Sequence, residues 1–351
     1  MDPSVSSFGI QEWDERTTSS VALGIMPDSP LHHFYTAGLV VGHRNAIPLL
    51  DNSKPFYLYT GRGPSTSSLH LGHLLPLMFT QALQHEYMCP LVIQMTDDEK
   101  FWASKDPSLT LEEVTFWGEA NLSQMMSLGF DPDLTFPFFN SKSSSILYPT
   151  YVELTKHWTL NQVKHTFGFS DSDPFGRYAY VGMQGAPAFA KTFSSCGWFD
   201  TDRYSHCLIP CATDQDPYFR LVRDVAHHLH APKPSLIFND VLPSLQGPSI
   251  KMSSSKPETA IFLTDSPKTV AKKIKSSFSG GGETKASHIA LGGNPDIDVA
   301  FLYIKAFCKD HKEVRALYEG YKAGKVFSSE MKKRAIEVVC EVLGSFRNVE
   351  K

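Results

Sequence analysis

The chain has 351 residues, of which 42% are hydrophobic and 20% are charged, a balance typical of globular proteins that excludes disordered, collagen-like and coiled-coil chains. Its length predicts two domains, or one large domain with an appendage, and its net charge of −4 argues against a polyanionic partner unless the charge is unevenly spread. No apolar run reaches the roughly 18 residues that cross a bilayer and the acidic N-terminus is no secretory signal, so we expect a soluble intracellular protein.

The first predicted unit is a strand, a glycine turn and a helix. Residues 1–50 are weakly patterned, with one short apolar stretch at 39–41, and we expect residues 1–30 to be an irregular lead-in. Phe56–Tyr59 then predicts a buried strand, Thr60–Pro64 a sharp turn, and Leu69–Tyr87 a helix with apolar periodicity.

Strands and helices continue to alternate downstream. Leu91–Met95 predicts a strand that runs into polar Thr96–Glu99, as happens where a parallel strand delivers functional residues at its carboxyl end. The later elements are predicted as a helix at Leu111–Leu128, a strand at Phe136–Phe139, a helix at Tyr148–Thr159, a strand at Cys207–Pro210 and a helix at Pro217–His230. This alternation predicts an α/β domain over residues 31–265 with a Rossmann-type, doubly wound parallel sheet.

The last part of the chain, residues 266–351, predicts an all-helical domain. Helices are expected at Val270–Ser276, Val299–Cys308, Lys312–Gly320 and Ser329–Leu343, and Ser279–Gly282 is expected to be a flexible connection. This region holds 13 Lys and 3 Arg against 3 Asp and 7 Glu, a net charge of +6, so the rest of the chain carries −10. Such asymmetry favours a polyanion bound by one domain, although a solvated lysine-rich helix face gives the same pattern.

Cysteines and histidines give no strong sign of a metal site. None of the six cysteines lies in a CxxC pair, so we expect free thiols rather than disulfides. Cys207 and Cys211 with His206 lack a second ligand pair. His227, His228 and His230 lie in a predicted helix, where adjacent side chains point to different faces, so chelation is not expected there either.

Two short motifs suit the binding of a nucleotide. His70-Leu71-Gly72-His73 stands at the predicted start of a helix that follows a strand, where free N–H groups and the helix dipole favour phosphate. Its two imidazoles lie three residues apart, on one face of the helix. Lys251-Met252-Ser253-Ser254-Ser255-Lys256 predicts a mobile lysine loop able to neutralise a departing pyrophosphate. Each motif alone is a weak signal.

Together, in this order and on this fold, the two motifs resemble the HIGH and KMSKS signatures of the class I aminoacyl-tRNA synthetases. Leu71 replaces the isoleucine and Ser254 the second lysine. Longer strings look like the eukaryotic cytosolic tryptophanyl-tRNA synthetases over roughly residues 31–345. These strings are Tyr57–Pro64, Val92–Lys100, Phe167–Asp173, Asp214–Arg220 and Ile261–Asp265.

The resemblance implies a site for tryptophan, whose side chain offers one N–H donor, no acceptor and a flat apolar ring. Tyr59 and Gln94 match the family positions that hold the indole nitrogen, and both can accept a hydrogen bond. Glu99 and Gln184 match positions around the substrate's ammonium, with Gln215 close by. A carboxylate beside a cation is what electrostatics requires.

The resemblance also implies an ATP site made of Thr60, Gly61, Arg62, Gly63, His70, Gly72, His73, Lys251, Met252 and Ser253. The tryptophan carboxylate would attack the α-phosphate, pyrophosphate would leave, and the adenylate would pass to the terminal ribose of tRNA(Trp). Arg62, His73 and Lys251 are the expected catalytic residues, acting by charge stabilisation, with Mg²⁺ carried on ATP and no metal site in the protein. The 266–351 domain would bind the anticodon end of the tRNA.

The family further implies a cytoplasmic homodimer with no membrane attachment. Compared with it, the chain is expected to be short at both ends. Three alternatives stay open: a tyrosyl-tRNA synthetase, against which Gln94 argues because a phenol favours a carboxylate; a smaller HxGH adenylyltransferase; and a catalytically silent protein on a synthetase fold, against which His73, Lys251 and Gln215 argue.

Overall fold

The structure is a computed structural model that describes residues 9–22, 24–254 and 256–347, with the side chains at positions 20, 22, 249, 251 and 347 left out. The chain folds into two compact units. The first comprises Met1–Tyr35, Val40–Ser67 and Met78–Asp240, and the second comprises Thr36–Leu39, Ser68–Leu77 and Val241–Lys351. The second unit thus includes residues 241–265, which precede the predicted boundary, and the segment with His70 and His73.

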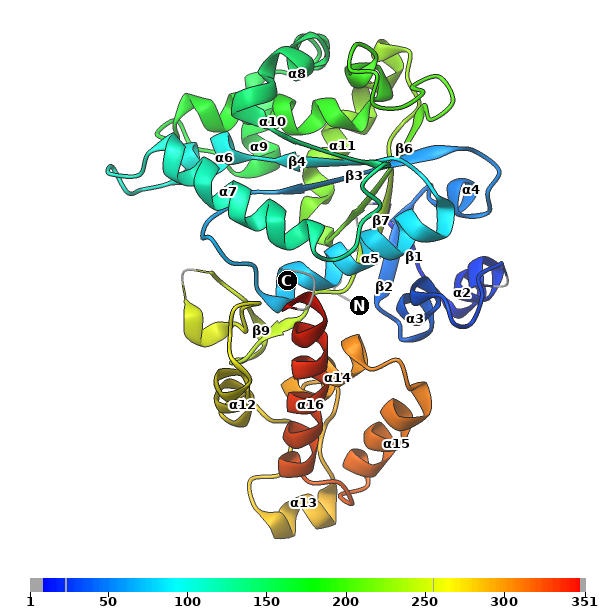
Figure 1. Cartoon of the computed structure of the whole chain (residues 1–351), viewed down its shortest axis with the longest axis vertical. Coiled ribbons are helices and arrows are strands. Elements are labelled where there is room, and N and C mark those ends of the chain that lie inside the picture. The colour runs from blue at the N-terminus through cyan, green and yellow to red at the C-terminus, as the bar shows by residue number, and fades with distance from the viewer. Residues whose placement is uncertain (1–8, 23, 255, 348–351) are drawn as a thin grey trace. The chain divides into compact units, whose positions relative to one another are not determined.

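A seven-stranded sheet forms the centre of the first unit, in the order β1-β2-β7-β6-β3-β4-β5 (Figure 1). Its strands are β1 (Gln11–Glu12), β2 (Val40–Arg44), β3 (Phe56–Arg62), β4 (Leu91–Met95), β5 (Thr135–Phe139), β6 (His206–Cys211) and β7 (Ser235–Asn239). The five strands from β7 to β5 are parallel, as the alternating pattern predicts, whereas β1 and β2 add an antiparallel edge.

Helices cover both faces of this sheet, which is why β4 is buried at every position and lacks apolar alternation. In Figure 1, α8 and α10 lie on one side of the strands and α7 on the other. The helices are α2 (Glu15–Ala22), α3 (Pro30–Thr36), α4 (Ile47–Leu50), α5 (Leu71–Tyr87), α6 (Asp97–Ala103), α7 (Leu111–Met126), α8 (Asn140–Thr155), α9 (Leu160–Phe167), α10 (Phe175–Gly185) and α11 (Asp216–Val225). Capping boxes at Thr110 and Thr159 start α7 and α9.

The sheet has a topological switch point between β3 and β6. The chain runs outward from β3 through β4 to β5, then returns to place β6 and β7 on the other side of β3. Ligands of such sheets bind at the carboxyl ends of the strands beside this point. Strand β3 extends to Arg62, so the predicted turn begins later: Gly61 pairs with Gln94 and Arg62 with Met95.

The second unit is helical apart from a short hairpin of β8 (Pro243–Ser244) and β9 (Gly247–Lys251). Its helices are α12 (Pro267–Lys275), α13 (Lys285–Leu291), α14 (Val299–Phe307), α15 (His311–Lys322) and α16 (Ser328–Arg347). Four of them match predicted helices, and α13 was not predicted. Buried Tyr303 of α14 donates its hydroxyl to the Pro243 carbonyl at 2.9 Å, which ties the helices to the hairpin.

The predictions for two connecting segments are wrong. Within the expected irregular lead-in, β1 and α2 form, and Trp13 stacks on Tyr35 with ring centroids 5.0 Å apart. The expected flexible connection at Ser279–Gly282 is tied down: the Asp298 carboxylate accepts from the Ser279 hydroxyl at 3.0 Å and from the Gly280 N–H at 2.9 Å. Both errors arise because the partners that order these segments are distant in sequence.

All six cysteines are free, as predicted, and four of them are buried. The three neighbouring histidines do not point apart as predicted: the rings of His227 and His228 lie 3.8 Å apart, and His157 stacks on His228. In the described part of the chain, no group of three His, Cys, Asp or Glu side chains is placed to hold a metal ion. Nor does that part contain a helix long and apolar enough to cross a membrane.

Candidate active site

Tyr59 and Gln94 meet on neighbouring parallel strands of the first unit. Both side chains are buried, Gln94 completely, and the Tyr59 hydroxyl lies 2.5 Å from Gln94 Oε1 and 2.9 Å from the Gln184 carbonyl oxygen. Burial raises the pKa of Tyr59 well above that of a free tyrosine, so the hydroxyl keeps its proton. The sequence-based pairing of these two residues is therefore matched by direct contact.

The carboxamide of Gln94 is held in one orientation. Its nitrogen donates to Asn140 Oδ1 at 2.8 Å and to the Met183 carbonyl at 3.0 Å. Both amide hydrogens are thus used, and the oxygen is left to accept. We call Tyr59, Gln94, Asn140 and Gln184 the amide cluster.

Gln215 extends the amide cluster toward β6 through its contact with Gln184. Gln184 lies on α10, and Gln215 ends the short 3₁₀ turn Thr213–Gln215 that follows β6. The Gln184 amide nitrogen donates to Gln215 Oε1 at 3.3 Å. The ring of Phe219 meets Tyr59 edge to face at 6.0 Å. Residues from both sides of the switch point are therefore joined.

Glu99 and Arg62 form a second, charged group in the same unit. Arg62 Nε donates to Asn121 Oδ1 at 3.2 Å, while Arg62 Nη2 is buried with no hydrogen-bond partner in the described chain. Burial lowers the pKa of Arg62 to about 10, an effect that the nearby Glu99 carboxylate opposes, so the guanidinium is charged at neutral pH. A buried cation with an unused donor is suited to an anionic ligand.

Gly63 lies close to Glu99 and Lys100: a Cβ atom there would lie 2.6 Å from the Glu99 carboxylate and 2.6 Å from Lys100, so both side chains would have to move. Glu99 also forms an ion pair with Lys100 at 3.2 Å. No hydrogen bond between described residues joins Glu99 to the amide cluster. Glu99 and Gln184, which were both predicted to lie around the substrate's ammonium group, are thus not joined by a hydrogen bond between described residues.

The two histidines of the HxGH motif belong to the second unit. Their rings stack with centroids 3.5 Å apart, as the three-residue spacing predicts. His73 Nδ1 accepts from the backbone N–H of His70 at 3.3 Å, and helix α5 begins at Leu71. The imidazoles therefore lie at the positive end of this helix, a position that favours phosphate.

The HxGH and KMSSS motifs pack against each other within the second unit. A Cβ atom on Gly72 would lie 3.1 Å from the His70 ring and 3.3 Å from the Met252 sulfur, so a larger residue would push these groups apart by a few tenths of an ångström. Strand β9 runs to Lys251, where a loop was predicted, and the side chain of Lys251 lies outside the described residues, as does Ser255. After it, the Ser253 N–H donates to the Thr259 hydroxyl at 3.1 Å.

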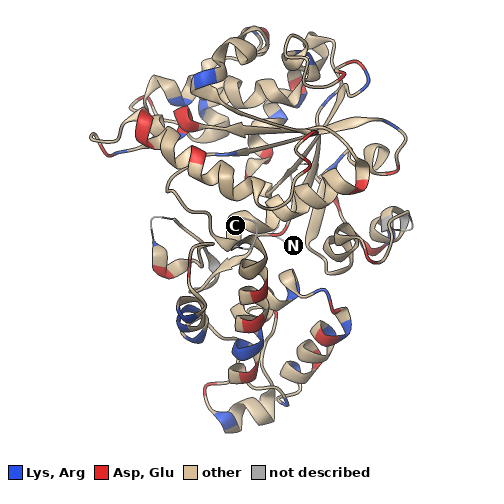
Figure 2. Ribbon diagram, viewed as in Figure 1, with Lys and Arg blue, Asp and Glu red and all other residues tan. Residues whose placement is uncertain are grey.

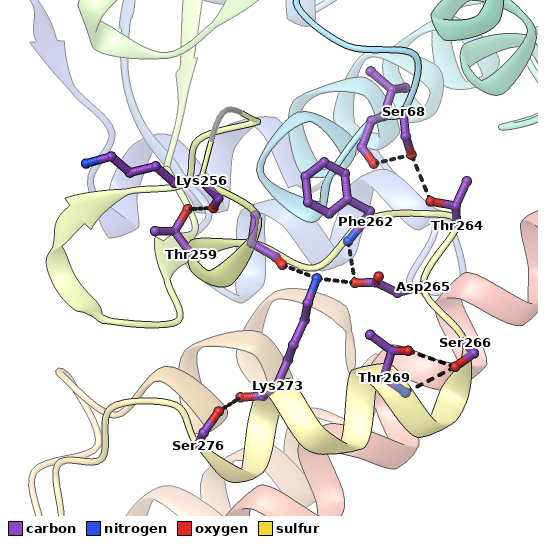
Figure 3. A network of polar contacts seen from close by, with 12 residues as sticks. Ser68, Lys256, Thr259, Phe262, Thr264, Asp265, Ser266, Thr269, Lys273 and Ser276 are labelled. Carbon is purple, nitrogen blue, oxygen red and sulfur yellow. Dashed lines mark hydrogen bonds and ion pairs between the residues drawn. The ribbon is translucent and has the colours of Figure 1, made fainter.

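A polar network fixes the segment that follows the KMSSS motif (Figure 3). Leu71 N–H donates to the Ile261 carbonyl at 2.9 Å, and Leu263 N–H donates to the Leu69 carbonyl at 3.0 Å. From α12, Lys273 donates to the Ala260 carbonyl at 2.8 Å and to Asp265 at 2.6 Å. Residues 260–265 are thus held against the start of the HxGH motif by backbone pairing and by one ion pair.

The predicted ATP-site residues divide between the two units. Thr60, Gly61, Arg62 and Gly63 end β3 in the first unit, and His70, Gly72, His73, Lys251, Met252 and Ser253 belong to the second. Within each unit the residues of a set lie together.

Three polar residues that contact predicted site residues were missed at the sequence level. Asn140 directly follows β5, and its place after a predicted strand could have drawn attention to it. Asp98 lies within the quoted Val92–Lys100 string and accepts from Asn140 Nδ2 at 2.9 Å. Asn121 is a buried residue in the middle of α7, and no sequence signal marks it as the partner of Arg62.

Comparison with known proteins links these features to one family. A family model described as tRNA synthetases class I (W and Y) matches residues 51–344. The cytoplasmic tryptophan–tRNA ligase of Homo sapiens is 42% identical over 348 residues, which cover 96% of this chain and 72% of the relative. That of Schizosaccharomyces pombe is 43% identical over 321 residues, covering 90% of this chain and 80% of the relative.

Solved structures agree with these relatives. The tryptophanyl-tRNA synthetase of Giardia lamblia superposes with a TM-score of 0.91 at 34% identity, covering 98% of this chain and 91% of that chain. The tryptophanyl-tRNA synthetase of Plasmodium falciparum superposes with a TM-score of 0.88 at 35% identity, covering 99% and 91%.

Proposed function

Because this chain belongs to the class I tRNA synthetases for tryptophan and tyrosine, we propose that it is a tryptophan–tRNA ligase. It activates L-tryptophan with ATP and then transfers the amino acid to the 3′-terminal ribose of tRNA(Trp). The amide cluster is the observation that carries the choice of amino acid.

An indole ring has one N–H donor and no side-chain acceptor, so its recognition needs a buried acceptor among apolar groups. Gln94 Oε1 is such an acceptor, since the amide nitrogen is already committed to Asn140 and Met183. One of the two lone pairs of this oxygen faces the Tyr59 hydroxyl, and the other is available to the indole N–H. This arrangement supports tryptophan over an amino acid without a donor.

The chemical step joins an amino-acid carboxylate to the α-phosphorus of ATP. The carboxylate oxygen forms the new P–O bond, the bond to the bridging oxygen breaks, and pyrophosphate leaves with that electron pair. Arg62, His73 and Lys251 stabilise the developing negative charge. The buried, unused Nη2 donor of Arg62 and the place of His73 at the start of α5 support these roles. Thr60, Gly61, Gly63, His70, Gly72, Met252 and Ser253 complete the ATP site.

Glu99 and Gln215 are proposed to face the substrate's ammonium group, together with Gln184. Mg²⁺ enters as the complex of ATP and stays on its phosphates. In the second step, the ribose hydroxyl of tRNA attacks the adenylate carbonyl carbon and AMP leaves.

Residues 266–351 are proposed to bind the anticodon end of the tRNA. In Figure 2 the ribbon of α12 carries several positions coloured as Lys or Arg, and Lys268, Lys272 and Lys275 of this helix are exposed. Contacts of lysine with phosphate release counterions, so the KM for tRNA should rise steeply with salt. Replacing one of these lysines with methionine should lower the logarithmic salt slope by about 1. An unchanged slope in all three variants would remove α12 from the tRNA contact.

The enzyme is further proposed to act in the cytoplasm as a homodimer. The exposed Tyr148 and Val152 lie one turn apart on α8 in the first unit, and an apolar surface of this kind suits a second copy of the chain. Sedimentation equilibrium at micromolar concentration should give twice the monomer mass, and a monomer mass would contradict the proposal.

Amino-acid-dependent exchange of labelled pyrophosphate into ATP tests the proposed reaction, because it measures adenylate formation without tRNA. Exchange should occur with tryptophan, and not with tyrosine or without amino acid. Exchange with tyrosine would overturn the assignment of Gln94, and no exchange with either would favour a silent protein on a synthetase fold.

A further inference from the structure

We infer that Asn140 and Asp98 are positioning residues that determine which end of the Gln94 carboxamide faces the substrate, and so select an amino acid with an N–H donor. The inference rests on the proposed function, since it concerns how the same site distinguishes its substrate.

The orientation of the two amides follows from hydrogen-bond chemistry. An ionised carboxylate and a backbone carbonyl can only accept, so an amide must turn its NH₂ group toward them. Asp98 Oδ1 lies 2.9 Å from Asn140 Nδ2, which leaves Asn140 Oδ1 facing Gln94 at 2.8 Å. Gln94 must then present its own NH₂ to Asn140 and to the Met183 carbonyl, and its oxygen to Tyr59.

Turning either side-chain amide by 180° is costly because both amides are buried. Gln94 is completely buried and Asn140 is 3% exposed. A flipped Asn140 would set its oxygen against the Asp98 carboxylate and its nitrogen against the nitrogen of Gln94. Leaving buried polar groups unpaired in this way costs the full desolvation penalty of each group. A single orientation of Gln94 is therefore strongly preferred.

The start of α8 is fixed by α6 at a second point. Asp97, which is fully buried, accepts from the Ser141 N–H at 3.1 Å, and its other oxygen accepts from the Ser141 and Thr115 hydroxyls. Asn140 thus has a fixed backbone as well as a fixed side chain. The two adjacent carboxylates of α6 serve one purpose, which is to hold the turn from β5 into α8 next to Gln94.

The consequence is discrimination by the donor rather than by the shape of the ring. A substrate N–H satisfies the second lone pair of Gln94 Oε1, whereas a ring of the same size without a donor leaves it unpaired. Sites built to bond a polar group reject analogues without that group far more strongly than apolar sites reject a difference in size. Without Asn140, the Gln94 amide is free to turn and this discrimination is lost.

The test compares tryptophan with β-(3-benzothienyl)alanine, in which sulfur replaces the indole N–H, in the pyrophosphate exchange assay. In Asn140→Leu and Asp98→Ala, the ratio of kcat/KM for the two substrates should fall by roughly 10–100-fold. The fall should come from a higher KM for tryptophan, with kcat within about twofold and the analogue unaffected. Asp98→Asn keeps an oxygen that can accept from Asn140 but loses the charge, so its ratio should fall by less than that of Asp98→Ala.

Gln84→Leu is the matched control, because Gln84 is also a completely buried amide, bonded to Thr135 at 2.9 Å, and has no contact with the amide cluster. It should lower the melting temperature and leave the ratio unchanged. If Asn140→Leu does not fold, the two Asp98 variants decide whether the inference holds. An unchanged ratio in Asp98→Ala, or an equal fall in Gln84→Leu, overturns the inference alone. Absence of exchange with tryptophan in the wild-type protein overturns the proposed function, and the inference with it.

Discussion

The amide cluster of the first unit and the two signature motifs of the second are held in place in different ways. In the amide cluster, side chains are held by hydrogen bonds to side chains from distant parts of the sequence, as Gln94 is by Asn140. In the second unit, the motifs are fixed by the backbone: residues 69–71 pair with residues 261–263, and Gly72 lies against Met252. The proposed amino-acid selection would thus depend on side-chain orientation, whereas the proposed phosphate chemistry would depend on the register of two chain segments.

The largest effect is expected from His73, at the start of α5. His73→Ala removes a donor that stabilises charge on the phosphates, so kcat for pyrophosphate exchange should fall by about 10²–10³. The KM for tryptophan should stay unchanged, because His73 belongs to the other group of residues. Steady-state kinetics with each substrate varied in turn checks this, and a changed KM for tryptophan with an unchanged kcat would break the distinction.

Gln94 should give the reverse pattern. Gln94→Ala removes the acceptor for the indole N–H, and the KM for tryptophan should rise on the order of 10²-fold while the KM for ATP is preserved. The same exchange assay measures both constants. An equal rise in both KM values would show that the effect spreads beyond amino-acid recognition.

Replacing Lys273 tests whether the register between residues 69–71 and 261–263 affects the binding of ATP. Lys273→Met removes the ion pair with Asp265 and the bond to the Ala260 carbonyl, which loosens residues 260–265 against the HxGH motif. We expect the KM for ATP to rise roughly tenfold, with the KM for tryptophan unchanged. Lys273→Arg should restore most of the loss.

A suitable control for Lys273 is Lys322→Met on α15. Lys273 lies over the ring of Phe262 and Lys322 over that of Tyr318, but Lys322 is exposed. The control should leave both KM values unchanged. Equal kinetics for Lys273→Met and Lys322→Met would mean that the backbone pairing alone sets the register.

The smallest effect is expected from pH. Burial raises the pKa of Asp98 to about 6, with the carboxylates of Asp97 and Glu99 adding to the shift and the hydrogen bond from Asn140 opposing it. Above pH 6 Asp98 is an acceptor that holds Asn140; below pH 6 it is protonated and that acceptor weakens. The KM for tryptophan should therefore rise several-fold between pH 7 and pH 5.

Two ionisable groups on neighbouring elements do not titrate between pH 5 and pH 7. Arg62 of β3, beside Glu99, has a pKa of about 10, and burial raises the pKa of Tyr180 of α10 far above the neutral range. Asp98→Asn cannot titrate, so its KM for tryptophan should be flat over the same interval. A persisting rise in this variant would assign the pH dependence to another group.

Local pattern was sufficient to predict β4, α5 and four of the five helices of the C-terminal region, because their apolar residues recur at the spacing of the element itself. It was also sufficient for the stacked pair His70 and His73, since three residues on a helix return to the same face. It failed for the segment before residue 40, where α2 is polar and is ordered next to Trp13 and its stacking partner Tyr35. It also failed for β7, which was not predicted although all five of its residues are buried.

The sequence by itself determined the α/β class, the family resemblance and the residue types that suit an indole and a polyphosphate, because these depend on composition, spacing and long quoted strings. Only the tertiary structure decided how those residues act. The orientation of Gln94 depends on Asn140, 46 positions away, and that of Asn140 on Asp98. The direction of a buried amide is set by which of its neighbours can donate and which can accept, and those neighbours are brought together only when β3, β4 and β5 lie side by side.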